Sequence, residues 1–80
     1  MKKLDIKDIE RILYEVFPIK KFSEEVEQLK YGDFKEWDSL GNFNLLLAVE
    51  EFYSIRFTPE EINTIRSIKQ ILTCLQNRVK

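Results

Sequence analysis

The sequence predicts an all-α domain, a small four-helix bundle of three main helices and one short helix, with a long connection after the first helix. Apolar residues recur at helical spacing in three segments, and residue types that begin helices precede them. A chain of 80 residues supports a single core, so residues 1–80 are expected to form one domain. A hydrophobic fraction of 44% and a charged fraction of 34% suit a packed core beneath a solvated surface.

The first predicted helix carries one broad apolar stripe and ends at Pro18. Asp5 is the expected N-cap, and Asp8, three positions on, is a weaker echo of the capping box. Pro18 ends the helix because the residue before a proline is pushed out of the α region. The stripe consists of Ile6, Ile9, Ile12, Leu13, Val16 and Phe17.

From Pro18 to Trp37 the helical pattern loosens. Ser23, with Glu24 and Glu25, could open a short helix that closes near Gly32. The connection holds too many large apolar residues for a free linker, and we expect it to be pinned to the core. These residues are Phe22, Val26, Leu29, Tyr31, Phe34 and Trp37. Long connections in small domains are often functional.

The second strong helix is predicted over residues 39–54. Its apolar residues spread over most of the circumference, so we expect it to be central and packed on more than one side. They are Leu40, Phe43, Leu45, Leu46, Leu47, Ala48, Val49, Phe52 and Tyr53. Residues 55–57 then look extended.

Thr58, Pro59 and Glu61 form a strong helix start, with a cap, a proline at the first helical position and a completed capping box. A short helix through about Arg66 fits, with Ile62 and Ile65 directed inward.

Ser67 and Gln70 repeat the capping-box spacing and open the last helix. The buried face of that helix is expected to hold Ile68, Ile71, Leu72, Leu75 and Val79.

Charge and composition exclude several classes of function. The net charge is −1 and the basic residues are scattered, whereas a nucleic-acid binder shows a basic stripe. No apolar run reaches the roughly 20 residues that cross a bilayer, so no membrane insertion is expected. Because acidic residues stand at positions 5, 8 and 10 where a signal peptide has an apolar stretch, we expect that the N-terminal segment is not a signal peptide. Cys74 is the single cysteine, which excludes an internal disulfide and fits a reducing cytoplasm.

The chain contains no histidine. Histidine is the side chain best tuned for proton transfer near neutral pH. Without it, Ser–His and Cys–His nucleophile pairs and the usual zinc sites cannot form within the chain. We therefore expect that the chain is not an enzyme.

Asp38 and Ser39 stand at the start of the second predicted helix and allow two interpretations. Both residue types cap helices, an interaction worth about 1 kcal/mol. Alternatively, the Ser39 hydroxyl is displayed in solvent at a rigid helix N-terminus. The partial positive charge there suits a phosphate, although Asp38 opposes it somewhat.

Residues 37–75 resemble the acyl and peptidyl carrier proteins, which bear a 4′-phosphopantetheine arm. The Asp-Ser-Leu motif of that family matches Asp38–Leu40, and its Ala-Leu-Glu-Glu run appears as Ala48–Glu51. The extended segment at 55–57 and the start at Thr58–Ile62 follow in register. About half of the chain matches at this detail.

The resemblance implies that a phosphopantetheinyl transferase attaches the arm to Ser39 from coenzyme A, using magnesium that Asp38 helps to place. The thiol of the arm then holds an acyl or aminoacyl group as a thioester, loaded and removed by separate loading enzymes and acyltransferases. We expect a stand-alone, monomeric, cytoplasmic carrier. The alternative is an unmodified carrier-like module that binds proteins and uses Asp38 and Ser39 only as a cap.

Many fatty-acid carriers place acidic residues where this chain has Gly41–Asn44, which predicts weaker charge steering of partners and a specialised pathway. The opposing interpretation is that Asn42 and Asn44 are merely solvated.

Candidate partner-binding residues are Leu40, Phe43, Glu50 and Glu51. For each of them a structural explanation competes: a core position for the apolar pair and a solvated helix face for the acidic pair.

Three further interpretations concern apolar residues. Trp37 could shield the arm, but an aromatic ring that pins the connection to the core is favoured. Cys74 is expected to be a small packing residue. A cleft for an acyl chain could be lined by Phe43, Leu46, Leu47 and Ile62, although such stripes are more often core.

Overall fold

The chain forms four α-helices and one 3₁₀ turn in a computed structural model that describes residues 4–19, 21–22 and 25–78. The elements are α1 (Ile6–Val16), η1 (Val26–Gln28), α2 (Ser39–Tyr53), α3 (Pro59–Thr64) and α4 (Ile68–Arg78). No strand occurs among the described residues. The predicted all-α bundle of three main helices and one short helix is therefore confirmed. None of the described helices is long and apolar enough to cross a membrane.

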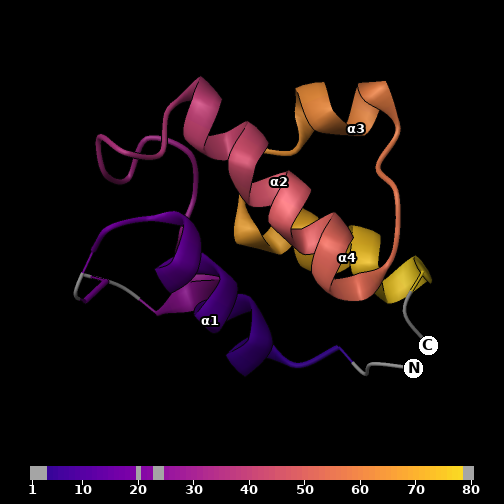
Figure 1. Ribbon diagram of the computed structural model, residues 1–80, viewed down its shortest axis with the longest axis horizontal. Coiled ribbons are helices and arrows are strands. Elements are labelled where there is room, and N and C mark those ends of the chain that lie inside the picture. Colours follow the sequence, from indigo (N-terminus) through magenta and orange to yellow (C-terminus); the bar gives the residue numbers. More distant parts are fainter. Residues whose placement is uncertain (1–3, 20, 23–24, 79–80) are drawn as a thin grey trace.

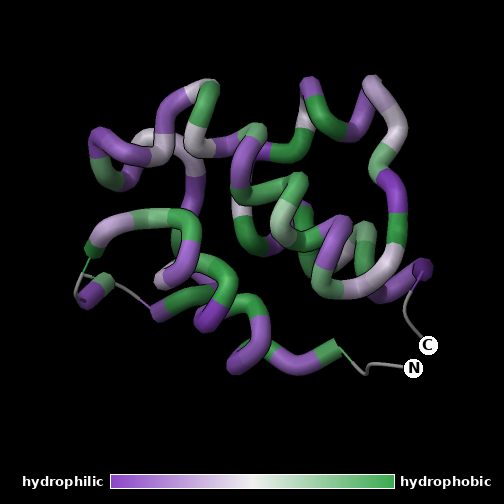
Figure 2. Tube along the Cα trace, viewed as in Figure 1, coloured by the Kyte–Doolittle hydropathy of each residue, from purple (hydrophilic) through white to green (hydrophobic). Residues whose placement is uncertain are grey.

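The helices enclose one core, to which every element except α3 contributes a buried side chain. Helix α1 packs against α2, while η1 packs against both α1 and α4 (Figure 1). Hydrophobic residues recur along each helix between hydrophilic ones, as expected of helices with one buried side (Figure 2). The core consists of Ile9, Ile12, Leu13, Phe17, Phe22, Val26, Leu29, Trp37, Leu45, Leu46, Val49, Tyr53, Phe57, Ile65, Ile68, Ile71 and Leu75.

Helix α1 begins and ends as predicted. The Asp5 backbone is extended, and its Oδ1 accepts a hydrogen bond from the Lys7 N–H at 2.9 Å. The helix ends at Val16, with Phe17 as its C-cap directly before Pro18. Capping by a carboxylate satisfies one of the free N–H groups of the first turn.

The connection is pinned to the core, but its predicted short helix is replaced by the single turn η1. Ser23 and Glu24 lie outside the described residues. The backbone after η1 pairs with the α3–α4 junction instead of continuing a helix. The Tyr31 N–H donates to the Arg66 carbonyl at 2.7 Å, and the Leu29 carbonyl accepts from the Ile68 N–H at 3.0 Å.

Aromatic rings hold both ends of the connection against α1. The Phe17 ring lies 5.1 Å from that of Phe34 and 5.6 Å from that of Trp37, measured between centroids. Phe22 stacks on Phe34 at 5.8 Å. Such pairs add about 0.5–1.5 kcal/mol each beyond the area that they bury. Tyr31 is the large apolar residue of the connection that stays exposed.

Helix α2 was expected to be central and packed on more than one side; it buries one broad side and exposes the other. Its buried side holds Leu45, Leu46, Val49 and Tyr53. On the opposite side the exposed fractions are 68% for Leu40, 44% for Phe43 and 42% for Leu47. The helix ends at Tyr53 because Ser54 adopts the left-handed conformation, with φ 55°.

Helix α3 has the predicted capping box and is shorter than expected. The Thr58 hydroxyl accepts from the Glu61 N–H at 3.1 Å, and the Glu61 carboxylate accepts from the Thr58 N–H at 2.8 Å. The helix ends at Thr64, not Arg66, because Ile65 turns to an extended conformation and buries its side chain. Ile62, predicted to point inward, is half-buried.

Ser67 lies directly before helix α4 and takes part in a variant of the predicted capping box. The Ser67 hydroxyl accepts from the Gln70 N–H at 3.1 Å, but the Gln70 side chain accepts from the Arg66 N–H at 2.7 Å instead of from that of Ser67. Ile68, Ile71 and Leu75 are buried as predicted. Leu72 is half-buried, and Val79 lies outside the described residues.

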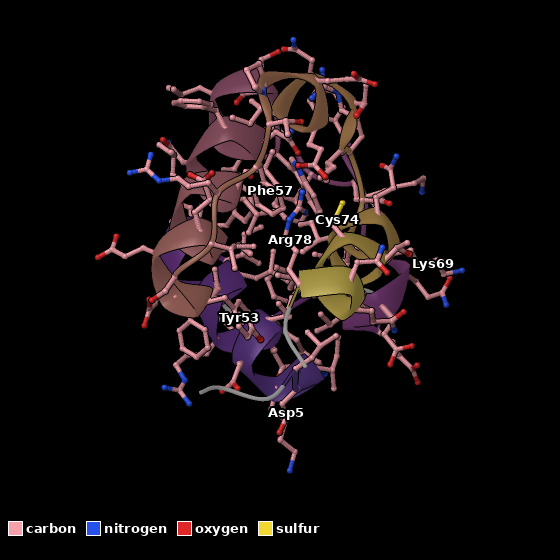
Figure 3. The ribbon with its side chains drawn as sticks, turned by 90° about the vertical axis from the view of Figure 1, so that its right-hand side faces the viewer. Asp5, Tyr53, Phe57, Lys69, Cys74 and Arg78 are labelled. Atoms are coloured by element: carbon pink, nitrogen blue, oxygen red, sulfur yellow. The ribbon has the colours of Figure 1, made fainter. Side chains whose placement is uncertain are left out.

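An ion pair links α3 to the end of α4. Arg78 Nη2 contacts the two Glu61 carboxylate oxygens at 2.7 and 2.8 Å, and its guanidinium lies 5.7 Å above the Phe57 ring (Figure 3). The hydrogen bond from the Thr58 backbone and the contact with Arg78 lower the pKa of Glu61. Cys74 is half-buried. Burial raises the pKa of its thiol, and the neighbouring Glu61 carboxylate raises it further. Cys74 is a packing residue, as predicted.

The core placement predicts that Leu46→Ala destabilises the protein strongly. Leu46 is only 1% exposed, so truncation leaves a cavity, and we expect the free energy of unfolding to fall by about 2–5 kcal/mol. Chemical denaturation followed by circular dichroism measures this. Leu47→Ala, on the exposed side of the same helix, is the matched control and should change stability by no more than about 1 kcal/mol. Equal losses in the two variants would contradict the orientation of α2.

Candidate functional site

Asp38 and Ser39, at the start of α2, have different roles. Asp38 is the N-cap: its Oδ1 accepts from the Gly41 N–H at 2.9 Å, and its carbonyl accepts from the Asn42 N–H at 2.8 Å. Ser39 is the first helical residue and is exposed. The capping function therefore belongs to Asp38, and the Ser39 hydroxyl is not used to cap the helix.

Gly41 lets the end of the connection approach α2. A Cβ atom at this position would collide with the carbonyl oxygen of Glu36 and would lie 2.9 Å from the ring of Phe17. Gly41 is buried, and because it has no Cβ atom the backbone at Glu36 can lie close against the helix.

Asn42 is a buried link between three segments. It is 2% exposed, its Oδ1 accepts from the Trp37 indole N–H at 2.9 Å, and its Nδ2 donates to the Ile65 carbonyl at 2.9 Å. The interpretation of Asn42 as a solvated residue is thus wrong, whereas Asn44 is exposed as expected. Trp37, 1% exposed, pins the connection to the core as predicted.

The surface around Ser39 is polar on one side and apolar on the other. The Tyr31 hydroxyl lies 3.3 Å from the Ser39 Oγ. Leu40 follows Ser39 as the most exposed large apolar residue, and Phe43 and Leu47 continue along the same side of α2. We call Leu40, Phe43 and Leu47 the apolar face.

The acidic candidates lie at the far end of α2 and differ from each other. The Glu50 Oε2 accepts a hydrogen bond from the Phe57 N–H at 2.6 Å, which ties the chain after α2 to the helix. Glu51 is exposed. An open depression of about 650 Å³ lies beside them, lined by Leu47, Glu50, Glu51, Ser54, Ile55 and Arg56. Glu50 thus has a structural role that its sequence position did not reveal.

The four residues considered for an acyl-chain cleft do not share one environment. Leu46 is part of the core, Ile62 is half-buried, and Phe43 and Leu47 are exposed. The structure therefore gives no support to a cleft lined by all four.

Within the described ranges, no group of three or more cysteine, aspartate or glutamate side chains is placed to hold a metal ion. Asp38 is exposed and uses its Oδ1 in capping.

Comparisons with protein-family models, with curated proteins and with solved structures found no match for this chain.

The Asn42 network predicts different effects for two asparagines on one helix. Asn42→Ala removes both hydrogen bonds and leaves the buried Trp37 N–H and Ile65 carbonyl unpaired, and each loss costs about 1–3 kcal/mol. Asn44→Ala, at an exposed position, should change stability by less than about 0.5 kcal/mol. Thermal unfolding and Trp37 fluorescence measure both variants. An unchanged emission spectrum and melting temperature in Asn42→Ala would contradict the network.

Proposed function

We propose that this chain is a carrier protein that bears a 4′-phosphopantetheine arm on Ser39 and holds acyl or aminoacyl intermediates as thioesters. The observation that carries the proposal is the exposed Ser39 hydroxyl at the first residue of α2, left out of capping because Asp38 supplies the cap. The resemblance of residues 37–75 to carrier proteins supports the same position. A carrier needs no catalytic group of its own, which fits a chain without histidine.

The surroundings of Ser39 suit a phosphodiester. Among the described residues, no hydrogen-bond partner is found for the amide groups of Ser39 and Leu40, the first two of α2. Free amide groups at a helix N-terminus favour an anion. The first turn of the helix contains no acidic residue that would repel it, although the Asp38 cap lies beside it.

The attachment is a group transfer that a partner transferase would catalyse. The Ser39 oxygen attacks the phosphorus that bears pantetheine in coenzyme A, and a new oxygen–phosphorus bond forms. The bond from that phosphorus to the bridging oxygen of the pyrophosphate breaks, and the adenosine bisphosphate half leaves. The hydroxyl proton passes to a base of the transferase. In this proposal Asp38 contributes a carboxylate oxygen to the magnesium ion that the transferase and coenzyme A hold.

The apolar face is the surface that we assign to partner enzymes. Leu40, Phe43 and Leu47 begin next to Ser39 and are exposed, so an enzyme that reaches the arm would meet them. Of the two acidic residues of α2, Glu50 is engaged with the Phe57 backbone, which leaves Glu51 as the exposed one. Docking would then depend on apolar burial more than on charge steering, so it should respond weakly to salt.

The same apolar face also favours the second candidate function, an unmodified module that binds proteins. Exposed apolar patches mark interaction surfaces whether or not a cofactor is attached. The two functions differ in the fate of Ser39, which only the carrier requires.

The deciding experiment is modification in vitro. The purified chain is incubated with coenzyme A, magnesium and a broad-specificity phosphopantetheinyl transferase, and intact mass is measured. We expect a gain of one phosphopantetheinyl group, which is lost in Ser39→Ala. Ser54→Gly is the matched control, because it removes an exposed serine at the other end of α2 and glycine accepts the left-handed conformation there. It should be modified like the wild type.

No mass gain with several transferases, for a chain whose circular dichroism shows it folded, would reject the carrier and favour the protein-binding module. A mass gain that persists in Ser39→Ala would place the attachment on another residue.

A further inference from the structure

Tyr31, in the connection before α2, approaches Ser39. It belongs to the connection, eight residues before Ser39, and its hydroxyl lies 3.3 Å from the Ser39 Oγ. This distance exceeds the usual 2.5–3.0 Å or so of an O–H···O hydrogen bond, so the contact is a weak one that biases the orientation of the Ser39 hydroxyl. An exposed serine at a helix start has three staggered χ1 wells, and a single partner on one side favours one of them.

The position of Tyr31 is fixed by contacts independent of Ser39. The Tyr31 N–H donates to the Arg66 carbonyl at 2.7 Å, and the Arg66 guanidinium lies 5.3 Å above the Tyr31 ring. A guanidinium within about 6 Å of a ring centroid is attracted to its face. The ring is therefore held from both its backbone and its face, and its hydroxyl points to a defined place.

The same support is connected to α2. Asn42 holds the Ile65 carbonyl one residue before Arg66, and Ile65 is buried. The α3–α4 junction that carries Arg66 is thereby fixed relative to the first turn of the helix that begins with Ser39. Tyr31 and the first turn of α2 are thus both hydrogen-bonded to the α3–α4 junction, which fixes their relative position.

We propose that Tyr31 is a positioning residue for the attachment reaction at Ser39. Its hydroxyl holds the Ser39 Oγ in one rotamer before transfer, while the transferase supplies the base that takes the proton. This inference rests on the proposed carrier function, because it assigns a role in the same group transfer. Tyr31 itself exchanges no proton and forms no bond to the incoming phosphorus.

The test compares Tyr31→Phe with Tyr14→Phe. Tyr31→Phe keeps the ring beneath Arg66 and removes only the hydroxyl. Tyr14→Phe is the matched control, since Tyr14 is similarly exposed and its ring contacts Phe22 on another part of the molecule. Two readouts are used: the three-bond Hα–Hβ couplings of Ser39 in the unmodified protein, and the steady-state kinetics of the transferase with each chain as substrate.

We expect Tyr31→Phe to move the Ser39 couplings toward rotamer averaging. Because the Tyr31 hydroxyl then no longer favours one of the three wells, kcat should fall, by at most about threefold, while KM stays unchanged. Tyr14→Phe should behave like the wild type in both readouts. Ser39 couplings that are the same in all three proteins, or an unchanged kcat, would overturn the positioning role.

Two other results separate this inference from the proposed function. A raised KM with unchanged kcat in Tyr31→Phe would make Tyr31 a contact for the transferase and would overturn its positioning role. A wild-type chain that is never modified would reject the carrier function, and with it any part of Tyr31 in the transfer. The coupling measurement would still show whether the Tyr31 hydroxyl orients Ser39.

Discussion

A single buried carboxamide organises the region around Ser39. Asn42 accepts a hydrogen bond from Trp37 at the end of the connection and donates one to Ile65 at the end of α3, both at 2.9 Å. A buried amide that has lost its water must find such partners, and when both are present it fixes their relative positions. Here it joins the end of the connection, the first turn of α2 and the end of α3, and it adds to the backbone hydrogen bonds between the connection and the α3–α4 junction. Apolar contacts alone specify position less sharply. The shape of the molecule at the start of α2 depends on this link.

The short segment from Trp37 to Asn42 combines buried and exposed residues. Trp37, Gly41 and Asn42 are buried, Asp38 caps the helix, and Ser39 and Leu40 are exposed. The helical period explains the division: Gly41 and Asn42 lie on the buried side of α2, which Leu45, Leu46 and Val49 continue three and four residues on, whereas Ser39 and Leu40 lie on the exposed side. Burial on one side makes the turn rigid, and exposure on the other leaves one hydroxyl and one apolar side chain available to other molecules. This combination is what a carrier's attachment site requires.

Much of the fold could be predicted because its signals are local. Asp5 before α1 and Thr58 with Glu61 before α3 act within three residues of themselves, so the sequence alone indicated both helix starts. The role of Asn42 could not be predicted in this way, since one of its partners lies 23 residues further on. The short helix predicted in the connection is only the single turn η1 for a similar reason, because the residues after it pair with the distant α3–α4 junction. For Leu40 and Phe43 the sequence left an exposed partner-binding position and a core position open, because hydrophobicity alone does not distinguish residues buried in the fold from those exposed on its surface.

The most direct measurement is mass spectrometry of the protein isolated from its own cells, with thioesters preserved and the peptide that contains Ser39 sequenced. The proposed carrier function predicts that Ser39, whose exposed hydroxyl does not cap α2, carries a phosphopantetheinyl group. Part of the population should carry an acyl or aminoacyl group on the thiol of that arm. A Ser39 peptide that is unmodified throughout, in a folded protein from cells that modify other carriers, would contradict the assignment of Ser39 as the attachment site.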